Sequence, residues 1–251
     1  MRTYRTSEVA KIIGIHPNTV RFYEEWGLIP KAERKSNGYR VFTDFHIEQL
    51  RLARLAFKIE VLQNGLRKKI VETIKISAKG DFDKALTLAR EYLSQIHKEQ
   101  KNAEEAIYIT KQLLEGKTSA EDVSFRRKEV SAYLNISMDT LRNWELNGLL
   151  SVKRMKNGYR FYTGEDIERL KIIRSLRCAN YSLEAILRML NALSANPQIN
   201  IEKVLNTPKN DADIISVCDK LIVSLQAAAR NAELMIKLLS DMKIKFNNLP
   251  Y

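Results

Sequence analysis

Four arginines stand at matching places in two parts of the chain, Arg21 with Arg142 and Arg40 with Arg160. A guanidinium is always charged and presents five N–H donors in a planar fork, which suits phosphates and the edges of bases. The first two follow residues that can open a short helix, and the second two follow an Asn-Gly turn. This pattern favours binding of a polyanion.

The positive charge is concentrated in two blocks. The chain has 251 residues and a formal net charge of +12. Residues 1–75 carry +7 and residues 125–190 carry +6, whereas residues 76–124 carry −2 and residues 191–251 carry +1. Charge that serves only solubility has no reason to alternate in this way. The distribution therefore indicates two separate surfaces for a polyanion.

The two basic blocks are copies of one another. Identities recur at a spacing of 121 residues, which becomes 120 after a one-residue deletion in the second copy. In the first copy they are Glu8, Val9, Ile15, Thr19, Arg21, Glu24, Gly27, Leu28, the run from Asn37 to Arg40, Thr43, Ile47, Glu48, Leu50 and Arg54. So many matches in one register indicate a tandem duplication.

Each copy predicts a helix-turn-helix followed by a β-hairpin. Residues 8–13 have apolar positions on one helical face, and Gly14 ends that helix. Pro17 opens a second helix, which ends near Gly27. A basic stretch and the Asn-Gly pair at residues 37–38 then predict a hairpin, or wing.

These motifs resemble the DNA-binding domain of MerR-type transcription regulators. The resemblance rests on residues 19–30 and 37–43 in the first copy and on residues 140–150 and 157–163 in the second. It covers about 70 residues twice, continues through residues 181–186 in the second copy, and is lost near residue 57 in the first. It implies winged helices that bind DNA, and dimerisation through an antiparallel coil of the helices that follow them.

The resemblance supplies a set of candidate DNA-binding residues. The recognition helix lies in a major groove, and its first residues approach base edges. The candidates are Asn18, Thr19, Arg21, Tyr23, Tyr39 and Arg40 in the first copy, and Thr140, Arg142, Trp144, Tyr159 and Arg160 in the second. By resemblance Tyr23 donates its hydroxyl to a phosphate, whereas Trp144 offers only its indole N–H. The alternative for the Tyr-Arg pairs of the wings is that they only brace the hairpin.

The two recognition helices differ in composition. Asp139 takes the place of Asn18, and because an acid repels phosphate we expect it to cap the helix instead. Phe22 is expected in the core, and Asn143 replaces it, which predicts different packing of the second helix. The two copies are therefore expected to prefer different half-sites.

A long helix is predicted after each winged helix. Apolar residues step by four and three from 82 to 114 and again from 214 to 246, a coiled-coil repeat. Neither helix has a partner within its own copy, so the two are expected to pair. The expected fold is mainly α, with two winged helix-turn-helix domains, each followed by a long helix, and the long helices forming an antiparallel coiled coil.

The expected domain layout follows from these elements. It comprises a first winged helix at 1–76, a first long helix at 77–115, a linker at 116–124, a second winged helix at 125–192, a connector at 193–210 and a second long helix at 211–247. One chain could then imitate a dimer, with a pseudo-two-fold axis between its halves. This pseudo-dimer is the favoured arrangement, and a homodimer with four winged helices is the alternative.

Other kinds of function find little support. Cys178 and Cys218 are far apart in sequence and the three histidines are scattered, so neither a metal site nor a cofactor is expected. Motifs for catalysis are lacking, which predicts that the protein is not an enzyme. No apolar run approaches the ~20 residues of a membrane span, and a cytoplasmic, bacterial setting is expected.

The sequence therefore predicts a regulator of transcription that binds double-stranded DNA at two half-sites. By resemblance it bends and untwists promoter DNA so that RNA polymerase can engage, although repression by occupancy is equally compatible. An architectural or excision-type DNA-binding protein of a mobile element is a second reading, and a protein-interaction module is a third.

Overall fold

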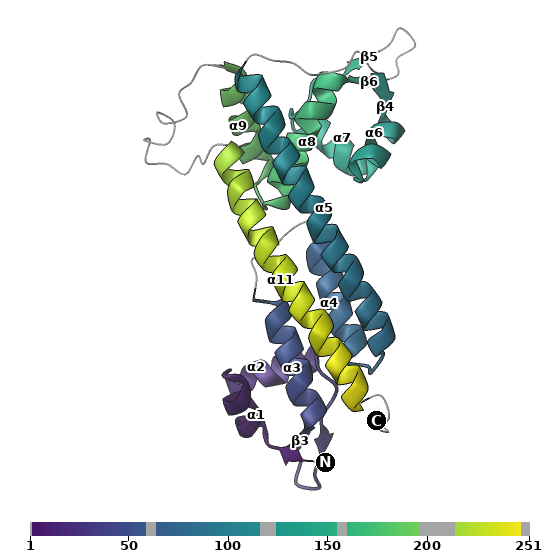
Figure 1. Ribbon diagram of the computed structural model, residues 1–251, viewed down its shortest axis with the longest axis vertical. Helices are drawn as coiled ribbons and strands as arrows, with labels where there is room; N and C mark the ends of the chain where they lie inside the picture. The colour runs from purple at the N-terminus through teal and green to yellow at the C-terminus, as the bar shows by residue number, and fades with distance from the viewer. Residues whose placement is uncertain (1, 59–63, 116–123, 155–159, 196–213, 247–251) are drawn as a thin grey trace. The chain divides into compact units, whose positions relative to one another are not determined.

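The computed structural model describes residues 2–58, 64–115, 124–154, 160–195 and 214–246 (Figure 1). These residues are mostly helical, which confirms the expected fold class at that level. They form two compact units. The first unit is drawn from 1–61, 65–97 and 226–251, and the second from 62–64 and 98–225.

The first unit contains the first helix-turn-helix and its wing. Its elements are β1 (Thr3–Tyr4), α1 (Thr6–Ile13), α2 (Pro17–Glu25), β2 (Glu33–Arg34), β3 (Arg40–Thr43), α3 (Asp44–Ala56), α4 (Leu66–Ser77) and the start of α5 (Phe82–Leu114). The hairpin of β2 and β3 turns at Gly38, whose φ of +80° suits glycine. Strand β1, which the sequence did not indicate, pairs antiparallel with β3 and completes a sheet of order β1-β3-β2.

The second unit repeats this arrangement. Its elements are β4 (Ser124–Arg126), α6 (Arg127–Leu134), α7 (Met138–Leu146), β5 (Lys153–Arg154), β6 (Arg160–Thr163), α8 (Gly164–Cys178) and α9 (Leu183–Ala195). The sheet order is β4-β6-β5. The tip of the second wing at 155–159, nearly all of the predicted linker, and most of the predicted connector lie outside the described residues.

The duplication extends to individual hydrogen bonds. The backbone N–H of Arg5 donates to Oε2 of Glu8 at 2.6 Å, and the N–H of Arg126 donates to Oε2 of Glu129 at 2.7 Å. Each bond satisfies a donor at the start of the first helix of the motif. The two helix-turn-helix motifs therefore begin with the same local geometry.

The end of each recognition helix is fixed by the helix that follows the wing. Nε2 of Gln49 on α3 donates to the carbonyl of Leu28 at 3.0 Å, and Nε of Arg169 on α8 donates to the carbonyl of Leu149 at 2.6 Å. Gln49 is fully buried and also donates to the carbonyl of Ile74 on α4. Because a buried polar group is costly to leave unpaired, these bonds hold the recognition helices in place.

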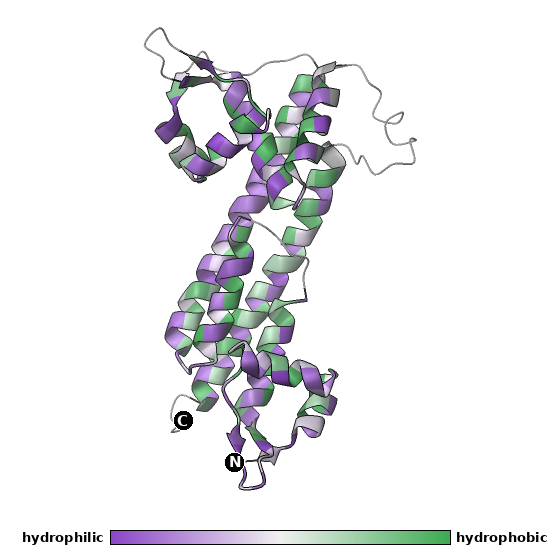
Figure 2. Ribbon diagram, turned by 180° about the vertical axis from the view of Figure 1, so that it is seen from behind, coloured by the Kyte–Doolittle hydropathy of each residue, from purple (hydrophilic) through white to green (hydrophobic). Residues whose placement is uncertain are grey.

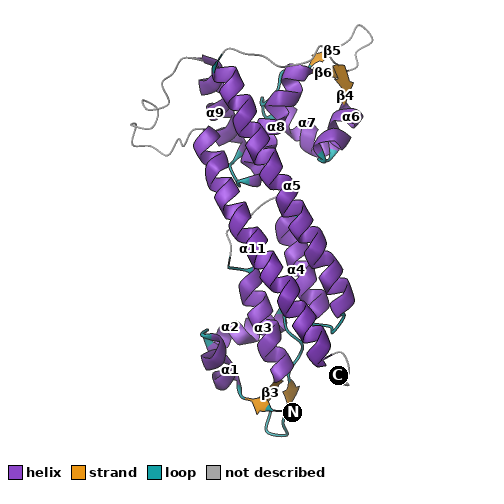
Figure 3. Ribbon diagram, in the orientation of Figure 1, coloured by secondary structure: helices purple, strands orange, loops and turns teal. Residues whose placement is uncertain are grey.

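The two long helices are α5 and α11 (Ile214–Phe246), and their bounds coincide with the predicted apolar repeats (Figure 3). Both carry apolar and polar residues in alternating stripes (Figure 2). In the first unit, Lys243 of α11 forms an ion pair with Asp83 of α5. In the second unit, Ile109 of α5 and Val217 of α11 belong to one hydrophobic core.

Candidate nucleic-acid interface

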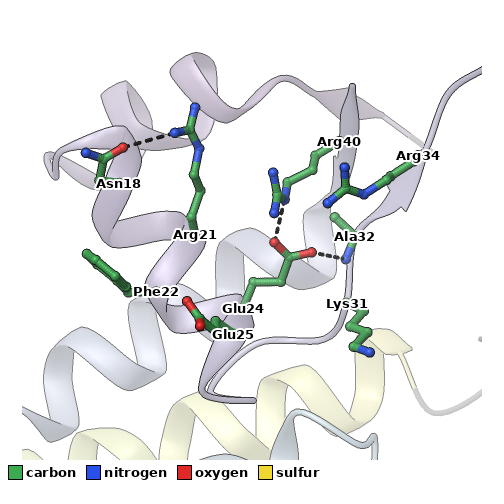
Figure 4. Close-up of a pocket in the computed structure, with 9 residues that line it drawn as sticks. All are labelled: Asn18, Arg21, Phe22, Glu24, Glu25, Lys31, Ala32, Arg34 and Arg40. Carbon is green, nitrogen blue, oxygen red and sulfur yellow. Dashed lines mark hydrogen bonds and ion pairs between the residues drawn. The ribbon is translucent and has the colours of Figure 1, made fainter. Parts of the chain in front are cut away.

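The N-terminal turn of α2 exposes two polar side chains together. His16 caps the helix, and its Nδ1 accepts the backbone N–H of Asn18 at 3.2 Å. Nη1 of Arg21 donates to Oδ1 of Asn18 at 3.1 Å, and both residues are exposed (Figure 4). Both candidates therefore lie at the helix end that a winged helix presents to base edges.

An open hollow of about 600 Å³ lies between α2 and the wing (Figure 4). Its lining residues are Asn18, Arg21, Phe22, Glu24, Glu25, Lys31, Ala32, Arg34 and Arg40. Four of these residues are cationic and two are acidic. One of the two acids is occupied by contacts within the protein, so the surface suits an anionic ligand.

Glu24 fastens the wing to the recognition helix. Its Oε2 accepts Nε of Arg40 at 2.6 Å, and its Oε1 accepts the backbone N–H of Ala32 at 3.1 Å. The Glu24 side chain is 10% exposed and that of Arg40 is 26% exposed. Arg40 therefore has the bracing contact that the sequence left as an alternative to phosphate binding.

Glu145 has the same place in the second copy. Its Oε2 accepts Nη2 of Arg127 at 2.5 Å and lies 3.3 Å from Nε of Arg160. Its Oε1 accepts the hydroxyl of Tyr162 on β6. Burial, together with this bond, raises the pKa of Tyr162 to about 12. Both copies thus couple the wing to the recognition helix through one buried glutamate.

The second recognition helix is capped by Ser137. Its Oγ accepts the backbone N–H of Thr140 at 3.0 Å and lies 2.8 Å from the Thr140 hydroxyl. The expectation that Asp139 caps the helix is therefore wrong, because Ser137 already accepts the orphan N–H. Asp139 is exposed in the first turn, where a carboxylate interacts favourably with the helix dipole. Arg142 is exposed, as Arg21 is.

Two candidates face the protein interior. Tyr23 is 8% exposed and makes an edge contact with Phe57, and Trp144 is 4% exposed within the core of the second unit. Their position follows from an i, i+3 pair of apolar residues, since Val20 and Leu141 are also fully buried. This spacing was available in the sequence, and it assigns both aromatic residues a packing role.

The expectations for Phe22 and Asn143 are corrected. Phe22 is 50% exposed and stacks on Trp26, so it is not a core residue. Asn143, at the matching position, is exposed as well. The second helix consequently packs as the first does, because the residues that enter the core are Tyr23 and Trp144.

The remaining candidates lie near the same surface or cannot be placed. Thr19 is half-buried, with its backbone N–H donating to the carbonyl of His16. Tyr39 is 70% exposed at the wing, and its N–H donates to Oδ1 of Asn37 at 3.2 Å. Tyr159 lies outside the described residues. Sequence reasoning missed the role of Glu24 and Glu145, although their identity in the repeat was a signal.

Other chemistry was sought in the part of the chain that the structure describes. There, no three His, Cys, Asp or Glu residues gather in a way that could hold a metal ion. None of the described helices is long and apolar enough to cross a membrane. Cys178 and Cys218 are buried free thiols, and burial raises the pKa of Cys178 to about 12.

In each unit, a helix-turn-helix is followed by a β-hairpin that is tied back to the second helix. This arrangement defines a winged helix-turn-helix, present twice. The family description "MerR family regulatory protein" matches residues 5–42, and "MerR HTH family regulatory protein" matches residues 125–193. The chain thus carries two MerR-type helix-turn-helix regions, one in each half.

Curated relatives match over short stretches. The transcriptional regulator CueR of Escherichia coli O157:H7 is 45% identical over 53 residues, which is 21% of this chain and 39% of the relative. The mercuric resistance operon regulatory protein of Bacillus cereus is 35% identical over 67 residues, covering 25% and 51%. The regulator ZntR of Escherichia coli K12 is 34% identical over 71 residues, covering 27% and 50%. The chain therefore spans about half the length of these relatives or less, and no solved structure matches it significantly.

Proposed function

We propose that this chain is a transcription regulator that binds double-stranded DNA sequence-specifically at two half-sites. The observation that carries the proposal is the repeated surface, in which an exposed recognition helix bearing Arg21 or Arg142 lies beside a wing tied to it by a glutamate. An exposed arginine at the start of a recognition helix suits guanine edges and phosphates. The names of the matched relatives, which are regulators, support the same class.

The proposed contacts are narrower than the sequence suggested. They comprise Asn18, Thr19, Arg21, Tyr39 and Arg40 in the first copy, and Thr140, Arg142 and Arg160 in the second, whereas Tyr23 and Trp144 are omitted because they are buried. Tyr159 stays a prediction. Asn18 and Arg21 are proposed to reach base edges, and the wing arginines to lie near the DNA backbone.

We further infer that the two long helices pair as an antiparallel coiled coil, so that one chain acts as a pseudo-dimer. Support comes from a buried contact in the second unit, between the long helix of the first copy and the winged helix of the second. Nη1 and Nη2 of Arg174 on α8 each lie 2.6 Å from an oxygen of Glu99 on α5. The two side chains are 6% and 2% exposed.

The first unit offers the reciprocal contact. The ring of Phe45 on α3 lies between Phe82 of α5 and Phe246 of α11, at centroid distances of 5.9 and 5.2 Å. Each winged helix thus packs on the long helix of the other copy, as pairing between halves requires. A homodimer that exchanges these helices is the competing arrangement.

Two recognition helices held at a fixed separation can reward DNA that is bent or untwisted to meet them. We propose that promoter DNA is distorted in this way, which would let RNA polymerase engage elements that are badly spaced. Occupation of the promoter without distortion would give repression instead. Circular permutation of the bound site in a gel distinguishes the two, since only bent DNA changes mobility with the position of the site.

Salt dependence and footprinting test the proposed function. Affinity for a selected duplex should fall steeply with salt concentration, because phosphate contacts release counterions. Arg21→Ala and Arg142→Ala should each weaken binding by about ten-fold, consistent with loss of an arginine contact to a base. Arg90→Ala, which removes an exposed arginine from α5, is the matched control and should change little. Unchanged affinity for both recognition-helix variants would overturn the assignment.

A further inference from the structure

The exposed face of α2 carries a stripe of one polar and two aromatic residues. Asn18, Phe22 and Trp26 follow one another at intervals of four, which places them on one side of the helix. Phe22 is 50% exposed and Trp26 is 59% exposed. Their rings stack with centroids 5.8 Å apart and planes at 26°. Large aromatic rings are not usually left exposed together unless they have something to contact.

The matching stripe of the second copy is wholly polar. Asp139, Asn143 and Asn147 occupy the same positions on α7. Nδ2 of Asn147 donates to Oδ1 of Asn143 at 2.9 Å and to the Asn143 carbonyl at 2.8 Å, where the first copy has its aromatic stack. The two helices agree in their buried residues and in their exposed arginine. The copies therefore diverge on the outer face, where a ligand is met.

The aromatic pair adjoins the cationic surface. Phe22 lines the same hollow as Asn18, Arg21 and Arg34, between the recognition helix and the wing (Figure 4). Whatever contacts the exposed Asn18 and Arg21 at the start of α2 also approaches the ring of Phe22 one turn later. The occupant must accordingly combine negative charge with an apolar group of small size.

We propose that Phe22 reads thymine in the first half-site, through contact of its ring with the C5-methyl group in the major groove. Trp26 is a positioning residue that stacks on the ring and holds its orientation. The thymine methyl is the apolar feature of the major-groove edges of base pairs, and phenylalanine is among the side chains that recognise it. Asn143 cannot make this contact and instead offers an amide, which suits adenine. This inference rests on the proposed function and names what distinguishes its two half-sites.

Replacement of thymine by deoxyuridine tests the proposal, because it removes the methyl group and leaves base pairing intact. A duplex is first selected from a random library with the full chain, and loss of protection in Arg21→Ala identifies the first half-site. Deoxyuridine is then placed in one half-site at a time. With the native chain we expect about a four-fold loss of affinity for each contacted methyl in the first half-site, the value of one buried methylene. In the second half-site the affinity should not change.

Variants assign the effect to the ring. Phe22→Asn, which installs the residue of the second copy, should make thymine and deoxyuridine equivalent in the first half-site, whereas Phe22→Leu should keep a preference for thymine. Trp26→Asn should weaken that preference. A first half-site selected without thymine, or equal sensitivity of the two half-sites to deoxyuridine, would overturn the proposal. Unchanged methyl sensitivity in Phe22→Asn would also overturn it and would leave the aromatic pair to a protein partner.

The outcome separates this inference from the proposed function. If no duplex is selected, or if Arg21→Ala binds as the native chain does, the proposed function fails. If Arg21→Ala weakens binding but removal of the methyl has no effect, only the reading of thymine by Phe22 fails.

Discussion

Nε of Arg40 donates to Oε2 of Glu24 at 2.6 Å, and this contact joins the wing to the recognition helix. Arg160 and Glu145 repeat it at 3.3 Å in the second copy. The wing cannot then move independently of the helix, which keeps two DNA-contacting elements in register. An arginine that accepts this restraint loses less conformational freedom when it meets a phosphate.

Glu24→Gln should loosen the first wing. The amide keeps the size of the side chain but removes the charge that holds Arg40, so the charge-assisted hydrogen bond is lost. Because Arg40 is 26% exposed, we expect a stability loss of only about 1 kcal/mol. DNA affinity should fall several-fold, although the change makes the surface more positive. Isothermal titration with a selected duplex measures it.

Glu104→Gln is the matched control for this variant. It neutralises an exposed glutamate of α5 and should raise affinity slightly or leave it unchanged, as expected from charge alone. If Glu24→Gln also binds more tightly, then net charge governs binding and the wing brace does not.

The buried ion pair of Arg174 and Glu99 should be important for the stability of the second unit. Glu99→Gln leaves a guanidinium buried without its counter-charge, which typically costs about 3 to 5 kcal/mol. Denaturant unfolding followed by circular dichroism measures the change. The double variant Arg174→Met with Glu99→Leu should recover most of the loss, since apolar residues of similar size remove both buried charges.

An exposed pair provides the comparison. Arg188 and Glu184 lie 2.9 Å apart on α9, with side chains 59% and 82% exposed. Arg188→Ala should therefore change the free energy of unfolding by less than about 1 kcal/mol. Equal effects of Arg188→Ala and Glu99→Gln would contradict the importance assigned to burial.

His46 should make the first unit less stable in acid. Its Nδ1 accepts the backbone N–H of Thr43 at 3.1 Å, and burial lowers its pKa below the ordinary value of 6.5. Below that pH the unfolded chain binds a proton that the folded chain resists, so acidification favours unfolding. The free energy of unfolding should fall as the pH is lowered from 7 to 5.

His46→Gln isolates this contribution, because glutamine can accept the same N–H without titrating in this range. The difference in unfolding free energy between the native chain and the variant should shift against the native chain as the pH falls. Parallel stability curves for the two proteins would contradict the assignment.

Both cysteines should be unreactive in the folded protein. Cys178 and Cys218 are 1% and 0% exposed, and burial raises the pKa of Cys178 to about 12. The thiolate, which is the reactive form, is then scarce at neutral pH. An aromatic disulfide reagent should label two thiols per chain only after denaturation, and rapid labelling of either thiol in the native state would contradict this.

The parts of the fold with strong periodicity were predictable from the sequence. The step of four and three apolar residues predicted helices from 82 to 114 and from 214 to 246, and the structure has helices with those bounds. The internal repeat predicted both helix-turn-helix motifs, with Pro17 and Ser137 at their expected places. A long repeat fixes such elements because every turn adds the same information.

Short elements and exposed faces were harder to predict. Strand β1 has two residues and β4 has three, too few to show an alternating pattern, and both form only by pairing with the wing strand. Phe22 was expected inside because of its hydrophobicity, whereas the i, i+3 pair of Val20 and Tyr23 determines which face is buried. The role of Glu24 depends on a partner 16 residues away and becomes apparent only in three dimensions.

The central claim is that one chain presents two DNA-reading winged helices to a single site. Native mass spectrometry of the complex with a selected duplex tests it most directly, since the mass gives the number of chains bound. We predict one chain of 29.0 kDa for each duplex that shows protection of both half-sites. Two chains on a duplex with only two protected half-sites would contradict the account.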